Sequence, residues 1–276
     1  MGSAKDFLLA HPVCAFCGGI RPSTTIERCP PRAMFQNRQW PEGFEFPACD
    51  KCNGGTRDDD LLIAMLARID PVENTGDMDG KVPGLMARAH KRHPGMFERM
   101  LAIGADGQPE ANGEWQITDE MRQAVDVIAA KLAKSIYWRE TQCFFPNEGG
   151  LAMSWFTNAD VASDGGYKLF EILQHIAGDA PPLTRSGTRL NDQFEYKFSL
   201  SPEKHILALQ AKFGNAFGFV VFGSTSPGLI ERNIQLAAAN SRADGVQPFR
   251  ILQSPTLALG ELRMTNCPWS TDRKGG

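Results

Sequence analysis

The chain has 276 residues, of which 42% are hydrophobic and 22% are charged, a composition typical of a folded globular protein and not of a disordered one. Its formal net charge of -3 excludes binding to nucleic acid through bulk positive charge, so any such binding requires a local basic region. The sequence has no run of about 18 apolar residues and no apolar leader. We therefore expect a cytoplasmic protein with no membrane partner.

Two short cysteine pairs stand near the start of the chain, Cys14-x-x-Cys17 and Cys49-x-x-Cys52. Each spacing places two thiolates on one tight turn, and two such turns supply the four soft ligands of a tetrahedral zinc ion. Because four protein thiolates leave no position for water, this zinc is expected to be structural. The sequence therefore predicts one Zn²⁺ held by Cys14, Cys17, Cys49 and Cys52.

Helical spacing of apolar residues predicts a largely helical region after the cysteine pairs. A first helix is expected over 49–68, and a basic helix, broken by a proline, over 85–102. The clearest helix covers 118–141, because Thr118 is a good N-cap and two acidic residues follow it in the first turn. A short helix is expected over 167–177.

Strands are predicted in the last third of the chain. Residues 193–200 alternate between apolar and polar, as a half-buried strand does. Segments 205–213 and 216–223 are consistent with two more strands joined by a tight turn, and a helix is the alternative for 205–213. We therefore expect an α+β fold with three parts: a zinc finger at 10–70, a helical segment at 80–145, and an α+β region with an antiparallel β-meander at 150–276.

The residues around the cysteine pairs form a distinctive pattern. Glu27-Arg28-Cys29-Pro30-Pro31 lies between the pairs, Asn53 follows the last cysteine, and three aspartates occupy 58–60. This arrangement resembles HNH endonuclease-like proteins with a CxxC…CxxC zinc finger, in which Glu-His-x-x-Pro ends a strand and Cys-x-x-Cys-Asn begins a helix. The resemblance implies a ββα finger of treble-clef type and metal-dependent hydrolysis of DNA phosphodiesters, with Mg²⁺ or Mn²⁺ beside the structural zinc.

Arg28 occupies the position of the histidine that serves as general base in that pattern. Histidine suits this role because its pKa lies near neutrality, whereas arginine keeps its proton at cellular pH. Three interpretations stay open: an inactivated nuclease, a pseudo-enzyme whose arginine binds a phosphate, or a nuclease whose base is a carboxylate, with Glu27, Glu42 and Asp59 as candidates. The resemblance places the candidate catalytic site at Arg28, Glu27, Asn53 and Asp59.

The function expected from these residues is that of an HNH-type DNA endonuclease by descent, impaired or inactive because Arg28 replaces the general base. The alternative is a non-catalytic, zinc-stabilised module that binds nucleic acid or a protein partner. A bound divalent ion distinct from the zinc would favour the enzyme.

Two groups of basic residues are candidates for DNA contact, one between the cysteine pairs and one in the basic helix. Their members are Arg21, Arg32 and Arg38, and Arg88, Lys91 and Arg92. If both groups face one groove, they form a phosphate-binding surface and give weak, salt-sensitive DNA binding. The alternative is that both are solvated faces without a ligand.

Overall fold

The computed structural model describes residues 3–69, 77–101, 116–157, 178–201, 205–233 and 250–252. Within these ranges it combines α-helices with antiparallel sheets, which confirms the predicted α+β class. None of the described helices is both long enough and apolar enough to cross a membrane. The helix predicted over 167–177 lies outside the described residues.

The N-terminal region is built on a two-stranded hairpin. Strand β1 (Thr25–Arg28) pairs antiparallel with β2 (Glu45–Ala48). The connection between them contains two 3₁₀ turns, η1 (Arg32–Met34) and η2 (Gln36–Arg38), and a short helix α1 (Ala4–Ala10) precedes the hairpin. A hairpin thus lies between the two cysteine pairs, as the ββα pattern predicts.

The single helix expected over 49–68 is two helices. The first, α2 (Asp50–Gly54), ends at a pair of glycines, and α3 (Arg57–Arg68) begins after Thr56, whose φ of -116° and ψ of 16° are not helical. Consecutive glycines favour a helix end because they lose more backbone freedom in a helix than other residues. The apolar spacing that predicted one continuous helix does not detect this break.

The helical middle agrees with the prediction. Helices α4 (Val82–Arg92) and α5 (Met96–Met100) are separated near the predicted break, where Gly95 has a positive φ of 74°. Helix α6 (Asp119–Thr141) begins after Thr118, whose side chain accepts a hydrogen bond from a backbone amide of the first turn. The predicted N-cap is therefore confirmed.

A five-stranded antiparallel sheet forms the C-terminal region. The meander β6 (Glu195–Ser201), β7 (Ile206–Phe213) and β8 (Phe217–Ser224) confirms the three predicted strands and settles 205–213 as a strand. Strand β3 (Gly150–Thr157) inserts between β8 and β9 (Arg250–Leu252). The sequence did not predict β3, because its first five residues are all buried and lack the alternation of a half-buried strand.

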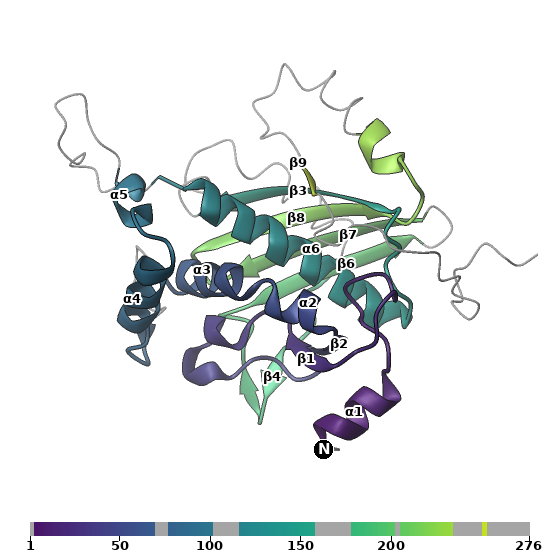
Figure 1. Cartoon of the computed structure of the whole chain (residues 1–276), viewed down its shortest axis with the longest axis horizontal. Helices are drawn as coiled ribbons and strands as arrows, with labels where there is room; N and C mark the ends of the chain where they lie inside the picture. Colours follow the sequence, from purple (N-terminus) through teal and green to yellow (C-terminus); the bar gives the residue numbers. More distant parts are fainter. Residues whose placement is uncertain are drawn as a thin grey trace, which may run out of the picture.

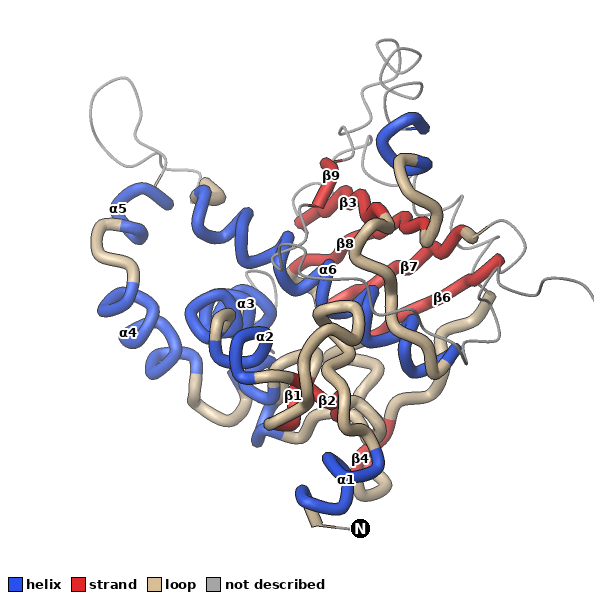
Figure 2. The backbone as a smooth tube through the Cα atoms, turned by 45° about the vertical axis from the view of Figure 1, so that its right-hand side comes forward, coloured by secondary structure: helices blue, strands red, loops and turns tan. Residues whose placement is uncertain are grey.

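The layers meet on α6. This helix lies across one face of the five-stranded sheet, and α3 packs against it (Figures 1 and 2). One buried apolar cluster contains residues from each of the three predicted segments, for example Phe46, Ile128 and Phe219. The three segments therefore share one core, and most of α6 lies within it, including Lys131 and Lys134.

A small second hairpin completes the N-terminal region from a distant part of the chain. Its strands are β4 (Thr184–Arg185) and β5 (Thr188–Arg189). The backbone amide of Glu42 donates to the carbonyl of Thr184 at 3.0 Å, and β4 lies close to β1 and β2 in Figure 1. The loop between β1 and β2 is therefore covered by residues about 140 positions further along the chain.

Candidate functional site

The four predicted metal ligands form one buried cluster. The sulfur atoms of Cys14, Cys17, Cys49 and Cys52 all lie within 4.8 Å of one another. A tetrahedral zinc ion with bonds of about 2.3 Å needs sulfur–sulfur distances of about 3.8 Å, which this arrangement nearly provides. No other group of three or more His, Cys, Asp or Glu residues in the described ranges is placed to hold a metal. The cluster can therefore hold a metal ion such as zinc.

Local backbone geometry explains why the sulfurs converge. In the first pair, the amide of Cys14 donates to the carbonyl of Arg21 at 2.9 Å, and Gly18 and Gly19 adopt positive φ values that close the turn. In the second pair, Cys49 is the N-cap residue of α2, and the helix brings Cys52 back over the same side. A hydrogen bond with Cys14, and a second with Cys52, lower the pKa of the Cys17 thiol, while hydrogen bonds among the same sulfurs raise the pKa of Cys14 and of Cys52.

A buried lysine lies next to the cysteine cluster. Lys134 on α6 is 4% exposed, and its Nζ donates to the carbonyl oxygen of Phe16, between the first two ligands, at 3.1 Å. Burial lowers the pKa of Lys134, and the thiolates of Cys52, Cys17 and Cys14 act in the opposite direction. An ammonium at this place opposes the negative charge of the thiolates.

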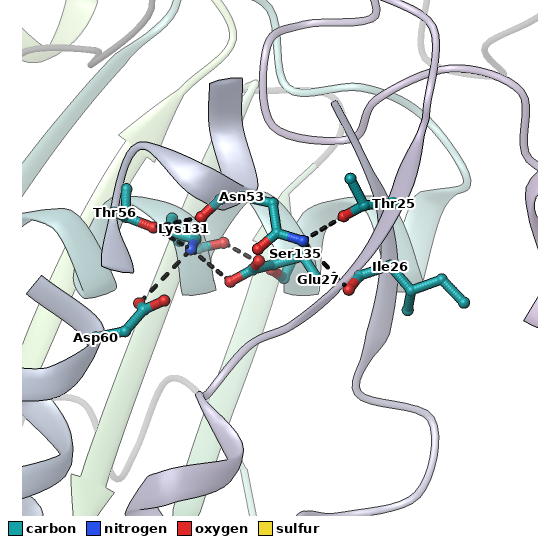
Figure 3. Close-up of polar contacts among 8 residues, drawn as sticks. All are labelled: Thr25, Ile26, Glu27, Asn53, Thr56, Asp60, Lys131 and Ser135. Carbon is teal, nitrogen blue, oxygen red and sulfur yellow. Dashed lines mark hydrogen bonds and ion pairs between the residues drawn. The ribbon is translucent and has the colours of Figure 1, made fainter. Parts of the chain in front are cut away.

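A second buried network surrounds Lys131, one turn earlier on α6 (Figure 3). Its Nζ lies 2.5 Å from Oε1 of Glu27, 2.8 Å from Oγ1 of Thr56 and 3.7 Å from Oδ1 of Asp60. The hydroxyl of Ser135 donates to the backbone carbonyl of Lys131 at 2.7 Å. One ammonium thus joins β1, the start of α3 and the centre of α6.

Burial and mutual charge together set the protonation of the side chains in this network. Burial raises the pKa of Glu27, and it raises the pKa of Asp60 to about 7, although Lys131 lowers both. Burial by itself would lower the pKa of Lys131, but the carboxylates of Asp60 and Glu27 outweigh it and raise that pKa. The lysine therefore stays charged, and the network holds one ammonium between two carboxyl groups.

The residues present do not fit a catalytic divalent cation beside Glu27. A cation there needs free carboxylate or amide oxygens. The carboxylates of Glu27 and Asp60 already face Lys131, whereas Asn53 directs its amide nitrogen to the Thr25 hydroxyl and the Ile26 carbonyl, which leaves its amide oxygen as the one ligand atom of this group (Figure 3). The ammonium occupies the place between the two carboxylates, so a second cation would meet its charge.

Of the four residues of the candidate catalytic site, Glu27 and Asn53 lie at this network. Asp59 is half-buried on α3, where burial raises its pKa and the charge of Lys131 lowers it. Arg28 lies on the opposite face of β1 from Glu27, because successive side chains of a strand point to opposite sides. Its Nε is 3.5 Å from Oε1 of Glu45, and its guanidinium lies 4.8 Å from the ring of Trp40.

The predicted DNA-contacting residues separate into groups with different neighbours. Arg32 stacks on Trp40, and Arg38 is close enough to Arg32 to lower its pKa. The basic residues of α4 line a hollow together with Arg57 and Asp58 of α3; they are Arg88, Lys91 and Arg92. Arg21 lies at the first cysteine pair, where its carbonyl accepts from Cys14.

Sequence reasoning missed Lys131 and Lys134. Charged residues within a helix are ordinarily assigned to its solvent face. The signal that could have located them is the composition of 127–138, where these two lysines are the only charged residues in an otherwise apolar or small stretch. A helix that is apolar on all sides is buried, so its lysines are buried as well.

Comparisons with protein-family models, curated proteins and solved structures found no match to this chain. The likeness to HNH endonucleases therefore depends on the residues of the chain itself. What the structure establishes at this site is a four-cysteine cluster able to hold a metal, and a buried ion network beside it.

Proposed function

We propose that this chain is a zinc-stabilised DNA-binding protein of HNH-type descent that has lost phosphodiester hydrolysis. The observation that carries the proposal is the ammonium of Lys131, held between Glu27 and Asp60. The resemblance implies a catalytic divalent cation held partly from the helix, and Lys131 places an ammonium between Glu27 of β1 and Asp60 of that helical region. A fixed, charged amine at that place holds the finger together, but it cannot polarise a phosphodiester as a bound metal does.

The engagement of Glu27 and Glu42, two of the three candidate bases, supports the loss of hydrolysis. Arg28 carries a guanidinium, which has donors and no acceptor for a proton, and it faces away from Glu27. Glu27 is engaged by Lys131, and Glu42 accepts a hydrogen bond from the amide of Ser186 at 2.9 Å, a contact that docks the β4–β5 hairpin. Each of these two carboxylates has a structural partner, which leaves Asp59 on α3 as the remaining candidate base.

Zinc is the metal that best suits the cysteine cluster. Four thiolates around Zn²⁺ carry a net charge of about -2, which is costly in a buried place unless a cation lies near. Lys134 supplies that cation against the first cysteine turn. The tetrahedral demand of zinc also agrees with four sulfurs that lie within 4.8 Å of one another.

Local basic surfaces support binding to DNA in a chain whose net charge is -3. Arg57 joins Arg88, Lys91 and Arg92 along the hollow between α3 and α4, where Asp58 is the opposing acid. A second group of arginines lies around Trp40. Such groups recognise phosphates without regard to the charge of the whole molecule.

A nicking assay tests the loss of hydrolysis. Supercoiled plasmid is incubated with Mg²⁺ or Mn²⁺ and with the parent chain, Arg28→His, or Glu27→Gln as a control for contaminating nuclease. We expect no nicking above the control from the parent or from Arg28→His, because the ammonium of Lys131 still lies between the carboxyl groups of Glu27 and Asp60. Metal-dependent nicking by the parent that Glu27→Gln abolishes would show that the chain is an active nuclease.

A binding assay on the same proteins tests whether the chain binds DNA. Fluorescence anisotropy with a labelled 20-base-pair duplex at low salt is expected to show binding that weakens as salt rises. A parent chain that neither nicks nor binds DNA contradicts the proposal, and the alternative of a protein-binding module then takes its place.

A further inference from the structure

Three arginines gather around one tryptophan on the outer side of the β1–β2 hairpin, and a fourth lies close to one of them. The guanidinium carbon of Arg185 lies 3.6 Å from the centroid of the Trp40 ring, and those of Arg28 and Arg32 lie at 4.8 Å and 4.9 Å. Arg38 is exposed on η2 beside them. We call these five residues the arginine–tryptophan cluster.

The fold itself builds this cluster. Arg185 is 145 residues from Trp40 in the sequence, and its Nη1 donates to the backbone carbonyl of Trp40 at 3.1 Å. The hairpin that carries it is fixed to the loop by the two hydrogen bonds of Glu42 already described. Trp40 is only 9% exposed, so the guanidinium groups lie against a ring that the protein holds in place.

The cluster carries an excess of positive charge. Glu45 is the carboxylate beside Arg28, and within the described part of the chain Arg32 and Arg38 form no ion pair. Burial lowers the pKa of Arg32, and the charges of Arg38, Arg28 and Arg185 lower it further. Like charges held this close repel one another, and a bound anion relieves that repulsion.

The stacked geometry leaves hydrogen-bond donors available. A guanidinium that lies over a ring keeps its N–H groups directed outward in its own plane, where they match the oxygens of a phosphate. Nε of Arg28 and Nε1 of Trp40 are buried and form no hydrogen bond within the described residues, and Oε1 of Glu45 lies 3.5 Å from the former, so the donors that face an anion are the terminal N–H groups of the arginines. An anion at the rim of the ring would meet several donors together.

From this geometry we propose that the arginine–tryptophan cluster binds the phosphodiester backbone of DNA, with Arg28, Arg32 and Arg185 donating to neighbouring phosphates and Arg38 at the rim. The inference deepens the proposed function and rests on it. In this proposal Arg28 and Arg185 bind phosphates, and Trp40 is the ring against which their guanidinium groups are held.

The test measures DNA affinity by anisotropy, with the same labelled duplex, at several salt concentrations. The variants are Arg32→Gln and Arg185→Gln, and the matched control is Arg189→Gln, an exposed arginine on β5 of the same hairpin. We expect each cluster variant to weaken binding roughly 3- to 10-fold at low salt and to reduce the slope of log affinity against log salt by about 1. Arg189→Gln should bind as the parent does.

Three results would overturn the inference. If only variants of Arg88 and Lys91 weaken binding, the proposed function stands and the DNA contact lies on α4 instead. If Trp40 fluorescence responds to inorganic phosphate while DNA binding is unchanged in Arg32→Gln and Arg185→Gln, the cluster is a small-anion site. If the parent does not bind DNA at all, the proposed function fails together with the inference. Zinc content and thermal unfolding of each variant exclude misfolding as the cause.

Discussion

The two faces of strand β1 place charge in opposite ways. On the inner face, Glu27 and Asp60 share the ammonium of Lys131, and all three side chains lie largely out of solvent. On the outer face, several guanidinium groups surround Trp40 with Glu45 as the opposing carboxylate. Buried charges that are paired stabilise one arrangement of the chain, whereas an unbalanced group at the surface attracts a ligand. The inner face therefore serves structure, and the outer face is the one for which we propose DNA binding.

The largest effect on stability is expected at the cysteine cluster, because it supports the hairpin that carries both faces of β1. Cys52→Ser removes one of four thiolates, so the zinc should be lost and the N-terminal region should unfold, because metal binding supplies folding free energy there. Elemental analysis and denaturant unfolding measure the two losses. Cys29→Ala is the matched control, since Cys29 is a buried free cysteine of the same region outside the cluster. Retention of one zinc per chain by Cys52→Ser would contradict the assignment.

A large loss of stability is expected at the inner face. Lys131→Met leaves two buried carboxyl groups without their cation, which typically costs about 3–5 kcal/mol in the free energy of unfolding. Urea unfolding measures this loss. Arg122→Met, at an exposed position of the same helix, should change the stability by no more than about 0.5 kcal/mol. Equal stabilities for the two variants would mean that the inner network does not hold the fold.

The inner face should also make stability depend on pH. The folded pKa of Asp60 is raised to about 7 from 3.8 by burial, with Glu27 and Asp59 acting in the same direction and Lys131 against them. As pH rises from about 4 to 7, the unfolded chain loses this proton first, so the folded state loses relative stability. As the pH rises from 5 to 8, the free energy of unfolding of Asp60→Asn should therefore increase relative to that of the parent by on the order of 2–4 kcal/mol. Parallel unfolding profiles for the two chains would disprove this account.

The smallest effect is expected at the outer face. Arg32→Gln removes a half-exposed charge that repels its neighbours, so the free energy of unfolding should change by less than about 0.5 kcal/mol while DNA affinity falls. Urea unfolding of this variant beside the parent checks the first part. A loss above about 2 kcal/mol would show that the cluster holds the loop in place, and the contrast between the two faces would disappear.

Features with a local cause could be predicted from the sequence. The paired cysteine spacings located the metal cluster, and Thr118 fixed the start of α6, because turns and caps depend on neighbouring residues. The meander was predictable because its strands follow one another along the chain with few residues between them. The break between α2 and α3 was missed because apolar spacing was given more weight than the glycine pair.

Features that join distant parts of the chain could not be predicted. Lys131 lies 104 residues from Glu27, and Arg185 lies 145 residues from Trp40. No periodicity within one segment reports such a pairing, since it arises only when α6 and the β4–β5 hairpin pack against the finger. Strand β3 was missed for a related reason, because both of its faces are covered by the rest of the fold.

The position of Lys131 and Lys134 on one helix limits how this finger can be reused. These lysines lie one turn apart on α6, and one neutralises the inner side of β1 while the other contacts the first cysteine turn. A finger cut out at residue 70 and joined to another protein would carry uncompensated carboxylates and thiolates on the surface that α6 covers. A transplant that keeps the fold must therefore bring α6 with it or supply two cations from the new host. In this chain the N-terminal region and α6 therefore form a single structural unit, although about 50 residues separate α3 from α6.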